Sequence, residues 1–136
     1  MSFISYAQNF EDVMLRRVFS ELDTGFYIDV GANDPSADSV TKAFYDRGWC
    51  GINIEPLSHH HADLLNARPR DINLCCAAGR DLGSLQIWEA DVRGWATADP
   101  EVISAYQALG YEGAWHTVDV LTLSEICRLH VRGAIH

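Results

Sequence analysis

The sequence has few basic residues. Its 10 Lys and Arg stand against 19 Asp and Glu, which gives a formal net charge of −9. Nucleic acid and anionic membrane surfaces would repel such a chain at long range, so we expect neither as a partner. The negative charge of the chain is compatible with a small neutral or cationic ligand.

Long apolar runs are also missing. No stretch approaches the roughly 20 apolar residues of a membrane-spanning helix, and the opening segment MSFISYAQNFEDVMLRR lacks the pattern of a secretion signal. We therefore expect a cytoplasmic protein. The length fits one domain over residues 1–136, and 48% hydrophobic residues is enough for a core.

Cysteine is scarce and shows no C-x-x-C spacing. The four cysteines are Cys50, Cys75, Cys76 and Cys127. We interpret them as reduced structural thiols, with a disulfide or a metal site as the alternative.

Three consecutive histidines, His59–His61, form another candidate metal motif. Placed at the start of a helix, His59 and His61 diverge, and we expect no carboxylate or cysteine to complete a ligand set. The pattern therefore predicts surface histidines and no metal site.

What the sequence does contain is an alternation of strands and helices. Apolar spacing, cap residues and glycines predict the first part of the chain as helix 10–22 capped by Asn9, strand 26–30, helix 40–47 capped by Asp38 or Ser39, strand 51–54, helix 58–66 and strand 71–78. The alternation predicts an α/β fold with three parallel core strands.

After Gly79 the pattern changes. SLQIWEA over residues 84–90 alternates like an antiparallel strand, and it is followed by an expected helix 100–109, a strand 116–121 and a last helix that begins at Thr122. We therefore expect antiparallel strands beside the parallel core.

Small and polar residues follow the first strand, in IDVGANDP. Ligands of open α/β sheets bind beyond the carboxyl ends of the strands. Gly31 would let the backbone pass close to a ligand, and Asp29 and Asn33 add an acid and an amide beside the same space. Asn33 and Ser36 stand where a dinucleotide site has its second and third glycines, which disfavours NAD without excluding it. A plain turn is the other alternative.

Glu55 follows the second strand at the same edge of the expected sheet. An acid there can accept hydrogen bonds from both hydroxyls of a ribose. The turn and Glu55 together favour an adenosine-containing ligand, with a solvated strand-end carboxylate as the alternative.

Three segments carry a resemblance to a known family: SYAQNFEDVMLRR from Ser5, GFYIDVGANDPSADSVTKAFYDRGWCGINIEP from Gly25, and RPRDINLCCAAG from Arg68. They resemble the opening motifs of FkbM-like methyltransferases, over a match from Ser5 to about Leu123. The resemblance implies a Rossmann-like class I methyltransferase fold. It also implies S-adenosylmethionine as methyl donor, and as acceptor usually a hydroxyl oxygen of a sugar or natural product.

The resemblance also implies roles for particular residues. The strand-end turn would face the methionine and ribose, Glu55 would hold the ribose hydroxyls, and two alanines after the third strand would flank the adenine. The cofactor-binding residues are then Asp29, Gly31, Ala32, Asn33, Glu55, Ala77 and Ala78. No catalytic residue is assigned, and His61, His116 and Asp34 are candidate bases for an alcohol acceptor. Ala96 departs from the family's usual Ser-Thr pair.

Members of this family continue with a fourth core strand after the helix represented here by LSEICRLHV, whereas the given chain ends at His136. In the expected strand order 3-2-1-4-5, the first strand would be left as an unprotected edge. We expect either a domain truncated before that strand or a partner over the edge, such as a second copy in a homo-oligomer. A catalytically inactive adenosine-binding or oligomerisation module is the alternative function.

Overall fold

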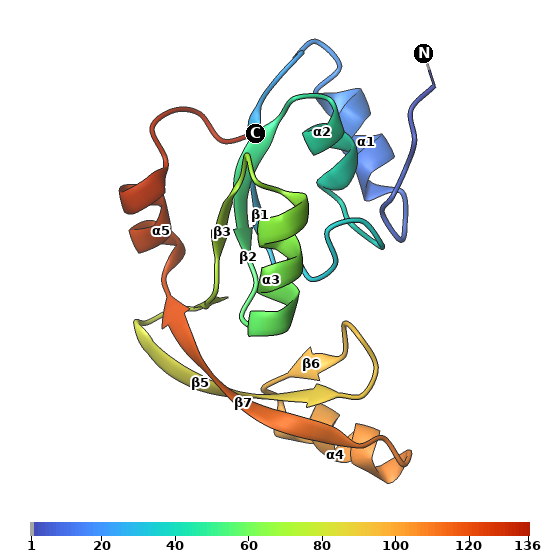
Figure 1. The fold of residues 1–136 in the computed structure, drawn as a ribbon, viewed down its shortest axis with the longest axis vertical. Helices are drawn as coiled ribbons and strands as arrows, with labels where there is room; N and C mark the ends of the chain where they lie inside the picture. Colours follow the sequence, from blue (N-terminus) through green and yellow to red (C-terminus); the bar gives the residue numbers. More distant parts are fainter. Residues whose placement is uncertain (1) are drawn as a thin grey trace.

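The structure is a computed structural model that describes residues 2–136 (Figure 1). Its helices and strands are α1 Glu11–Val18, β1 Phe26–Val30, α2 Lys42–Asp46, β2 Cys50–Ile54, α3 Ser58–Ala67, β3 Ile72–Leu74, β4 Ala77–Ala78, β5 Gly83–Ala90, β6 Ala96–Thr97, α4 Pro100–Ala108, β7 Gly113–Leu121 and α5 Leu123–His130. They build a mixed α/β fold with two sheets, one in the order β1-β2-β3 and one in the order β4-β7-β5-β6.

The first sheet is parallel, as the alternating pattern predicts. Its side chains alternate between two faces, and one face carries the apolar core of Ile52 and Ile54 with Ile126 from α5. On the other face Tyr27 packs with Phe44 and Trp49. Figure 1 shows this sheet edge-on, with α5 on one side and α2 and α3 on the other.

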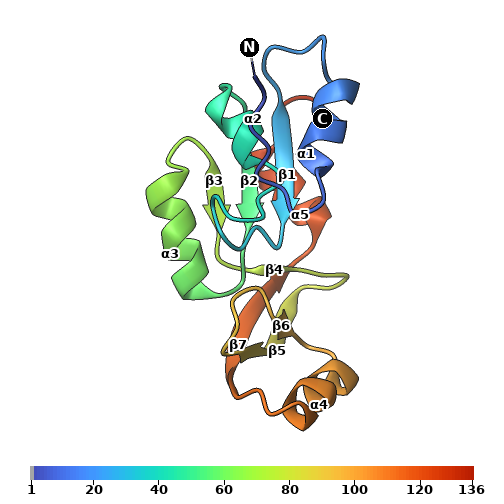
Figure 2. The ribbon, with the colours of Figure 1, turned by 90° about the vertical axis from the view of Figure 1, so that its right-hand side faces the viewer.

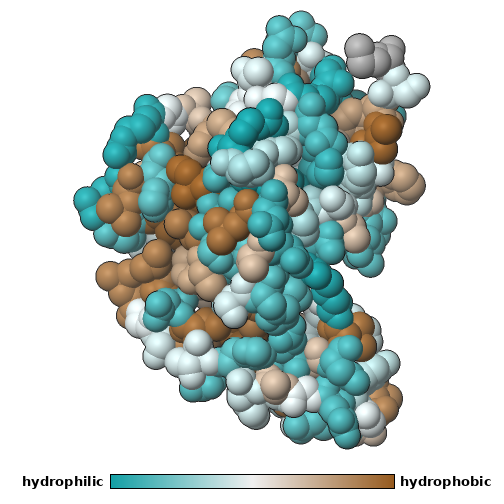
Figure 3. Space-filling model, viewed as in Figure 1, coloured by the Kyte–Doolittle hydropathy of each residue, from teal (hydrophilic) through white to brown (hydrophobic). Residues whose placement is uncertain are grey.

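The second sheet is built on the long antiparallel pair β5 and β7, which confirms the antiparallel prediction for residues 84–90. It curls away from the first sheet, and α4 packs against it (Figures 1 and 2). Trp88 and Ala90 of β5 form its core with Ile103 of α4. In Figure 3 the surface is notched between the parts built on the two sheets.

The strand predicted over residues 71–78 is wrong as one element. It breaks at Cys75 and Cys76, so that β3 ends in the first sheet and β4 pairs with β7 in the second. Cys76 is buried in the core and Cys75 is exposed. The break occurs because Ala77 and Ala78 find their partners at Val120 and Leu121, a long-range pairing that local sequence does not encode.

The first helix is shorter than predicted. It begins after Phe10, whose φ of 61° is left-handed, and it ends at Val18. Asn9 is not its cap; instead the Glu11 carboxylate accepts a hydrogen bond from the Asn9 backbone N–H at 2.9 Å. Before α2, the Ser39 Oγ accepts from the Lys42 N–H at 3.1 Å. The N-cap residue is Thr41, however, so neither Asp38 nor Ser39 is the cap, and α2 is shorter than the predicted helix 40–47.

None of the helices within residues 2–136 is long and apolar enough to cross a membrane.

Candidate functional site

The turn after β1 folds over the end of β2. The N–H groups of Gly31 and Ala32 donate to the Ile54 carbonyl at 2.8 and 3.1 Å. Gly31 has a φ of 74°, and a Cβ built on it would meet no atom within 4 Å. The backbone at Gly31 therefore faces open space, as close approach to a ligand requires.

Glu55 joins this turn to the one after β2. It is 4% exposed. Its Oε2 accepts from the Asn33 N–H at 2.8 Å, and its Oε1 accepts from the Leu57 N–H at 3.0 Å. This burial excludes the solvated carboxylate. His60 Nδ1 lies 3.8 Å from Oε1, beyond hydrogen-bond distance. Because a carboxylate offers about four lone-pair sites, each oxygen keeps one for a ligand.

Three of the residues selected from the sequence, Gly31, Asn33 and Glu55, line one cavity of about 190 Å³, which we call the strand-end cavity. Its other lining residues are Pro56, Leu57, His60, Ile87, Gly94 and Ala96. Ile87, Gly94 and Ala96 come from β5, β6 and the loop between them, so the site lies where the two sheets meet.

The remaining selected residues lie elsewhere. The Asp29 carboxylate accepts from the Thr41 hydroxyl at 2.7 Å. Its burial raises the pKa of Asp29, although the Thr41 hydrogen bond and the charge of Arg68 act in the opposite direction. Ala32 stays in the turn, while Ala77 and Ala78 form β4 beside β7. None of these four lines the strand-end cavity.

A buried arginine anchors the loop after the turn. Arg68, 1% exposed, donates to the Pro35 carbonyl at 2.8 Å and to the Ser39 hydroxyl at 3.1 Å. It also donates to the Tyr27 hydroxyl at 3.2 Å and lies 3.5 Å from the Asp71 carboxylate. Sequence reasoning missed this network, because RPRD after a helix gives no sign that its first arginine is buried.

A second arginine ties the two sheets together across the cavity. Arg93, in the connection from β5 to β6, donates through Nε to the Asn33 side-chain oxygen at 3.2 Å. Its Nη2 donates to Asp63 of α3 at 3.0 Å. These contacts hold Gly94 and Ala96 over the turn, and no sequence pattern indicates them.

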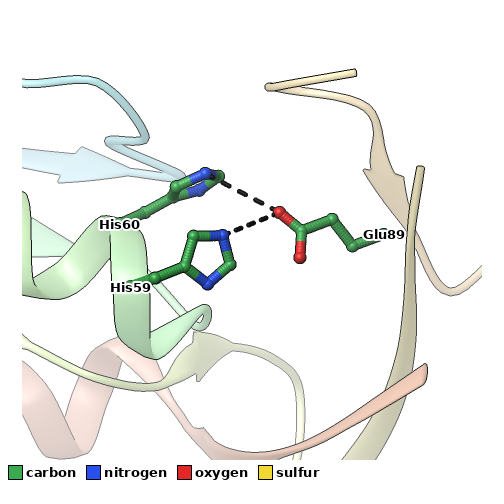
Figure 4. A group of neighbouring side chains, drawn as sticks. All are labelled: His59, His60 and Glu89. Atoms are coloured by element: carbon green, nitrogen blue, oxygen red, sulfur yellow. Dashed lines mark hydrogen bonds and ion pairs between the residues drawn. The ribbon is translucent and has the colours of Figure 1, made fainter. Parts of the chain in front are cut away.

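Two histidines of α3 meet a glutamate of β5 (Figure 4). His59 Nε2 lies 2.9 Å from Glu89 Oε1, and His60 Nε2 lies 3.7 Å from the same oxygen. His60 is 4% exposed, so the prediction of surface histidines is wrong for it, as is the prediction that no carboxylate joins them. The reason is that β5, distant in sequence, passes beside the start of α3.

The surroundings of His60 differ from those of His61. Burial lowers the pKa of His60, and the charges of Arg93 and His59 lower it further. His61 turns away, with Nε2 3.0 Å from the Asn73 carbonyl, so the divergence expected for His59 and His61 is confirmed.

The histidine–glutamate cluster opens onto a larger space of about 570 Å³, which we call the histidine cavity. It is lined by His59, His60, Glu89, Ala90, Asp91, Arg93, Glu112, Gly113 and Ala114. His60 lines both cavities.

Of the candidate bases, His116 is the one in contact with this cluster. Its Nε2 lies 3.0 Å from Glu89 Oε2. Asp34 instead accepts hydrogen bonds from the N–H groups of Ser36 and Ala37.

Comparison with known families agrees with the resemblance seen in the sequence. The family model described as Methyltransferase FkbM domain matches residues 29–136. The chain belongs to this family. Its membership indicates methyltransferase activity. No curated protein and no solved structure matches the chain.

The matched range of this FkbM domain begins at Asp29 and contains the turn, Glu55 and both cavities. The family implies a methyl donor. The residues present fit one that carries an adenosine, because a buried carboxylate with free lone pairs lies beside a glycine that faces open space.

Proposed function

We propose that this FkbM domain binds S-adenosylmethionine at the strand-end cavity and methylates a hydroxyl oxygen of a sugar or natural product. The observation that carries the proposal is Glu55, buried beside Gly31 and lining that cavity. We further propose that β1-β2-β3 is the first half of a Rossmann-like class I methyltransferase sheet.

Glu55 is suited to hold the ribose. Its two oxygens are fixed by the N–H groups of Asn33 and Leu57, so their remaining lone pairs point in set directions. Two vicinal hydroxyls donating to them would form charge-assisted hydrogen bonds. The open space at Gly31 would take the methionine part.

We assign the adenine to a third cavity. It is lined by Pro56, Leu57, Ser58, Cys75, His116, Thr117, Val118 and Asp119, and it shares Pro56 and Leu57 with the strand-end cavity. Burial raises the pKa of the Cys75 thiol, and the charges of Glu55 and Asp119 raise it further. Because the thiol is neutral, the part of the lining that Cys75 forms carries no charge and can pack against a flat ring. In this proposal Cys75 flanks the adenine, and Ala77 and Ala78 support it from β4.

When bound, S-adenosylmethionine supplies an activated methyl group, so the protein's part is to hold the acceptor oxygen in line with it. The strand-end cavity, at about 190 Å³, is smaller than most ligand sites, but the histidine cavity that adjoins it through His60 adds about 570 Å³. We assign the acceptor to the histidine cavity.

Calorimetric titration with S-adenosylhomocysteine and, in parallel, with NAD tests the proposal. We expect saturable binding of S-adenosylhomocysteine and none of NAD. Glu55→Gln should weaken the affinity by about tenfold or more, since it removes a charged acceptor, worth about 1.5–3 kcal/mol. Glu101→Gln, on the exposed first turn of α4, is the matched control.

Because Glu55 also fastens two turns, a second variant separates binding from folding. Ala96→Trp fills the strand-end cavity from its exposed β6 wall without replacing Glu55. It should abolish binding while the melting temperature stays near that of the native chain. Full affinity in Ala96→Trp, or tighter binding of NAD, would contradict the proposed site.

A further inference from the structure

His59 and Glu89 line the histidine cavity and not the strand-end cavity, whereas His60 lines both. One ligand atom from each of the three residues lies within 4.8 Å of the others (Figure 4). We propose that these three side chains bind a divalent transition-metal ion of the zinc class and leave its fourth position open to the histidine cavity.

The two distances from the histidines to Glu89 suit a tetrahedral site. Zinc binds imidazole nitrogen and carboxylate oxygen at about 2.0–2.2 Å, so two ligands of one ion lie roughly 3.3 Å apart. The His59 and His60 Nε2 atoms lie 2.9 and 3.7 Å from Glu89 Oε1. Small side-chain rotations would therefore bring all three atoms around one ion.

The ligand set is chemically consistent. Two imidazoles and one carboxylate, with water or substrate in the fourth position, are typical of catalytic zinc sites. A metal ligand must be a neutral imidazole, and burial of His60 favours its neutral form. His59 and His60 come from consecutive positions of the first turn of α3, and Glu89 meets them from β5.

His116 supplies an independent observation. Its Nε2 is buried and makes no hydrogen bond, although it lies 3.0 Å from Glu89 Oε2. An ion on Oε1 would fix the carboxylate and leave Oε2 to His116. Such outer partners orient the carboxylate of a metal site, and their loss usually weakens metal binding 10- to 100-fold.

The open coordination position of the ion would bind the acceptor hydroxyl, a role that rests on the proposed function. His60 lines both cavities, so an acceptor hydroxyl on the ion would lie beside the methyl donor. A divalent ion lowers the pKa of a bound hydroxyl and orients its oxygen. Metal binding itself does not depend on that role.

The test is metal binding by the chain without cofactor. After removal of metal with EDTA, Zn²⁺ titrated by calorimetry should bind with one-to-one stoichiometry, and Co²⁺ should give the visible spectrum of a tetrahedral nitrogen and oxygen site. His59→Ala and Glu89→Gln should each weaken Zn²⁺ binding by about tenfold or more. His61→Gln is the matched control, because His61 belongs to the same histidine run but contacts Asn73.

Three results would overturn the proposal: no Zn²⁺ binding, equal affinity in both ligand variants and the native chain, or a thiolate-to-cobalt band that places the ion on cysteine. Circular dichroism of each metal-free variant shows whether it is folded. The readout contains no nucleoside, so loss of the metal site and loss of S-adenosylhomocysteine binding are separate results.

Discussion

At the residue scale, two acids at the ends of neighbouring strands behave differently. Both Asp29 and Glu55 were expected to face a ligand. Glu55 lines the strand-end cavity, whereas Asp29 accepts from Thr41 beneath the turn. Sequence could locate both at the carboxyl edge of the sheet, but the direction of Asp29 depends on Thr41, which lies in another segment.

Asp29 provides a test of this assignment through pH. Burial raises its folded pKa above the ordinary value of 3.8, so the folded chain holds the proton more tightly than the unfolded chain does. The contribution of Asp29 to stability is then complete below that value and is lost as pH rises through the folded pKa. Asp29→Asn should therefore raise the free energy of unfolding more at about pH 8 than at about pH 4. Urea unfolding measures both values. A loss of stability that is larger at about pH 8 than at about pH 4 would show that the charge is needed and would contradict the assignment.

At the element scale, periodicity and turn residues located the strands of the first sheet and its helices, although the ends of α1, α2 and β3 differ from the prediction. The prediction of strand 26–30 matches β1, and that of helix 58–66 differs from α3 by one residue. The last helix begins after Thr122 as expected, since its hydroxyl accepts from the Glu125 N–H. Local rules failed where the chain changes sheet, at Cys75 and Cys76, and for the two-residue β6.

The contact between β1 and β2 depends on one glycine. A Cβ on Gly51 would collide with the backbone carbonyl and ring of Tyr27, neither of which can move without disturbing β1. Gly51→Ala should lower the free energy of unfolding by about 3 kcal/mol, an overpacking cost. Gly83→Ala, where a Cβ meets no atom within 4 Å, is the control and should change it by less than about 0.5 kcal/mol. Equal effects of the two substitutions would contradict this packing.

At the scale of the whole molecule, the candidate site is a product of the contact between two sheets. Sequence could select Gly31, Asn33 and Glu55 because they follow parallel strands. It could not select Arg93 or Glu89, whose partners Asn33 and His59 lie far away along the chain. Those long-range contacts close the strand-end cavity and create the histidine–glutamate cluster.

β1 is an edge strand of the first sheet in the part of the chain that the structure describes. His136 lies at the start of β1. Its backbone N–H donates to the Phe26 carbonyl at 2.9 Å. We propose that a second copy covers the rest of this edge, because exposed strand edges pair readily. Sedimentation of the purified chain should then give a dimer or a larger species. A folded monomer at all concentrations would contradict this.

The central claim is that the strand-end turn and Glu55 bind the adenosine part of a methyl donor. Backbone amide shifts during titration of the isotope-labelled chain with S-adenosylhomocysteine test it most directly. We expect the largest shifts at Gly31, Ala32, Asn33 and Leu57, since the last two donate to Glu55. Shifts confined to residues outside the strand-end cavity, or no shifts at saturating ligand, would contradict the claim.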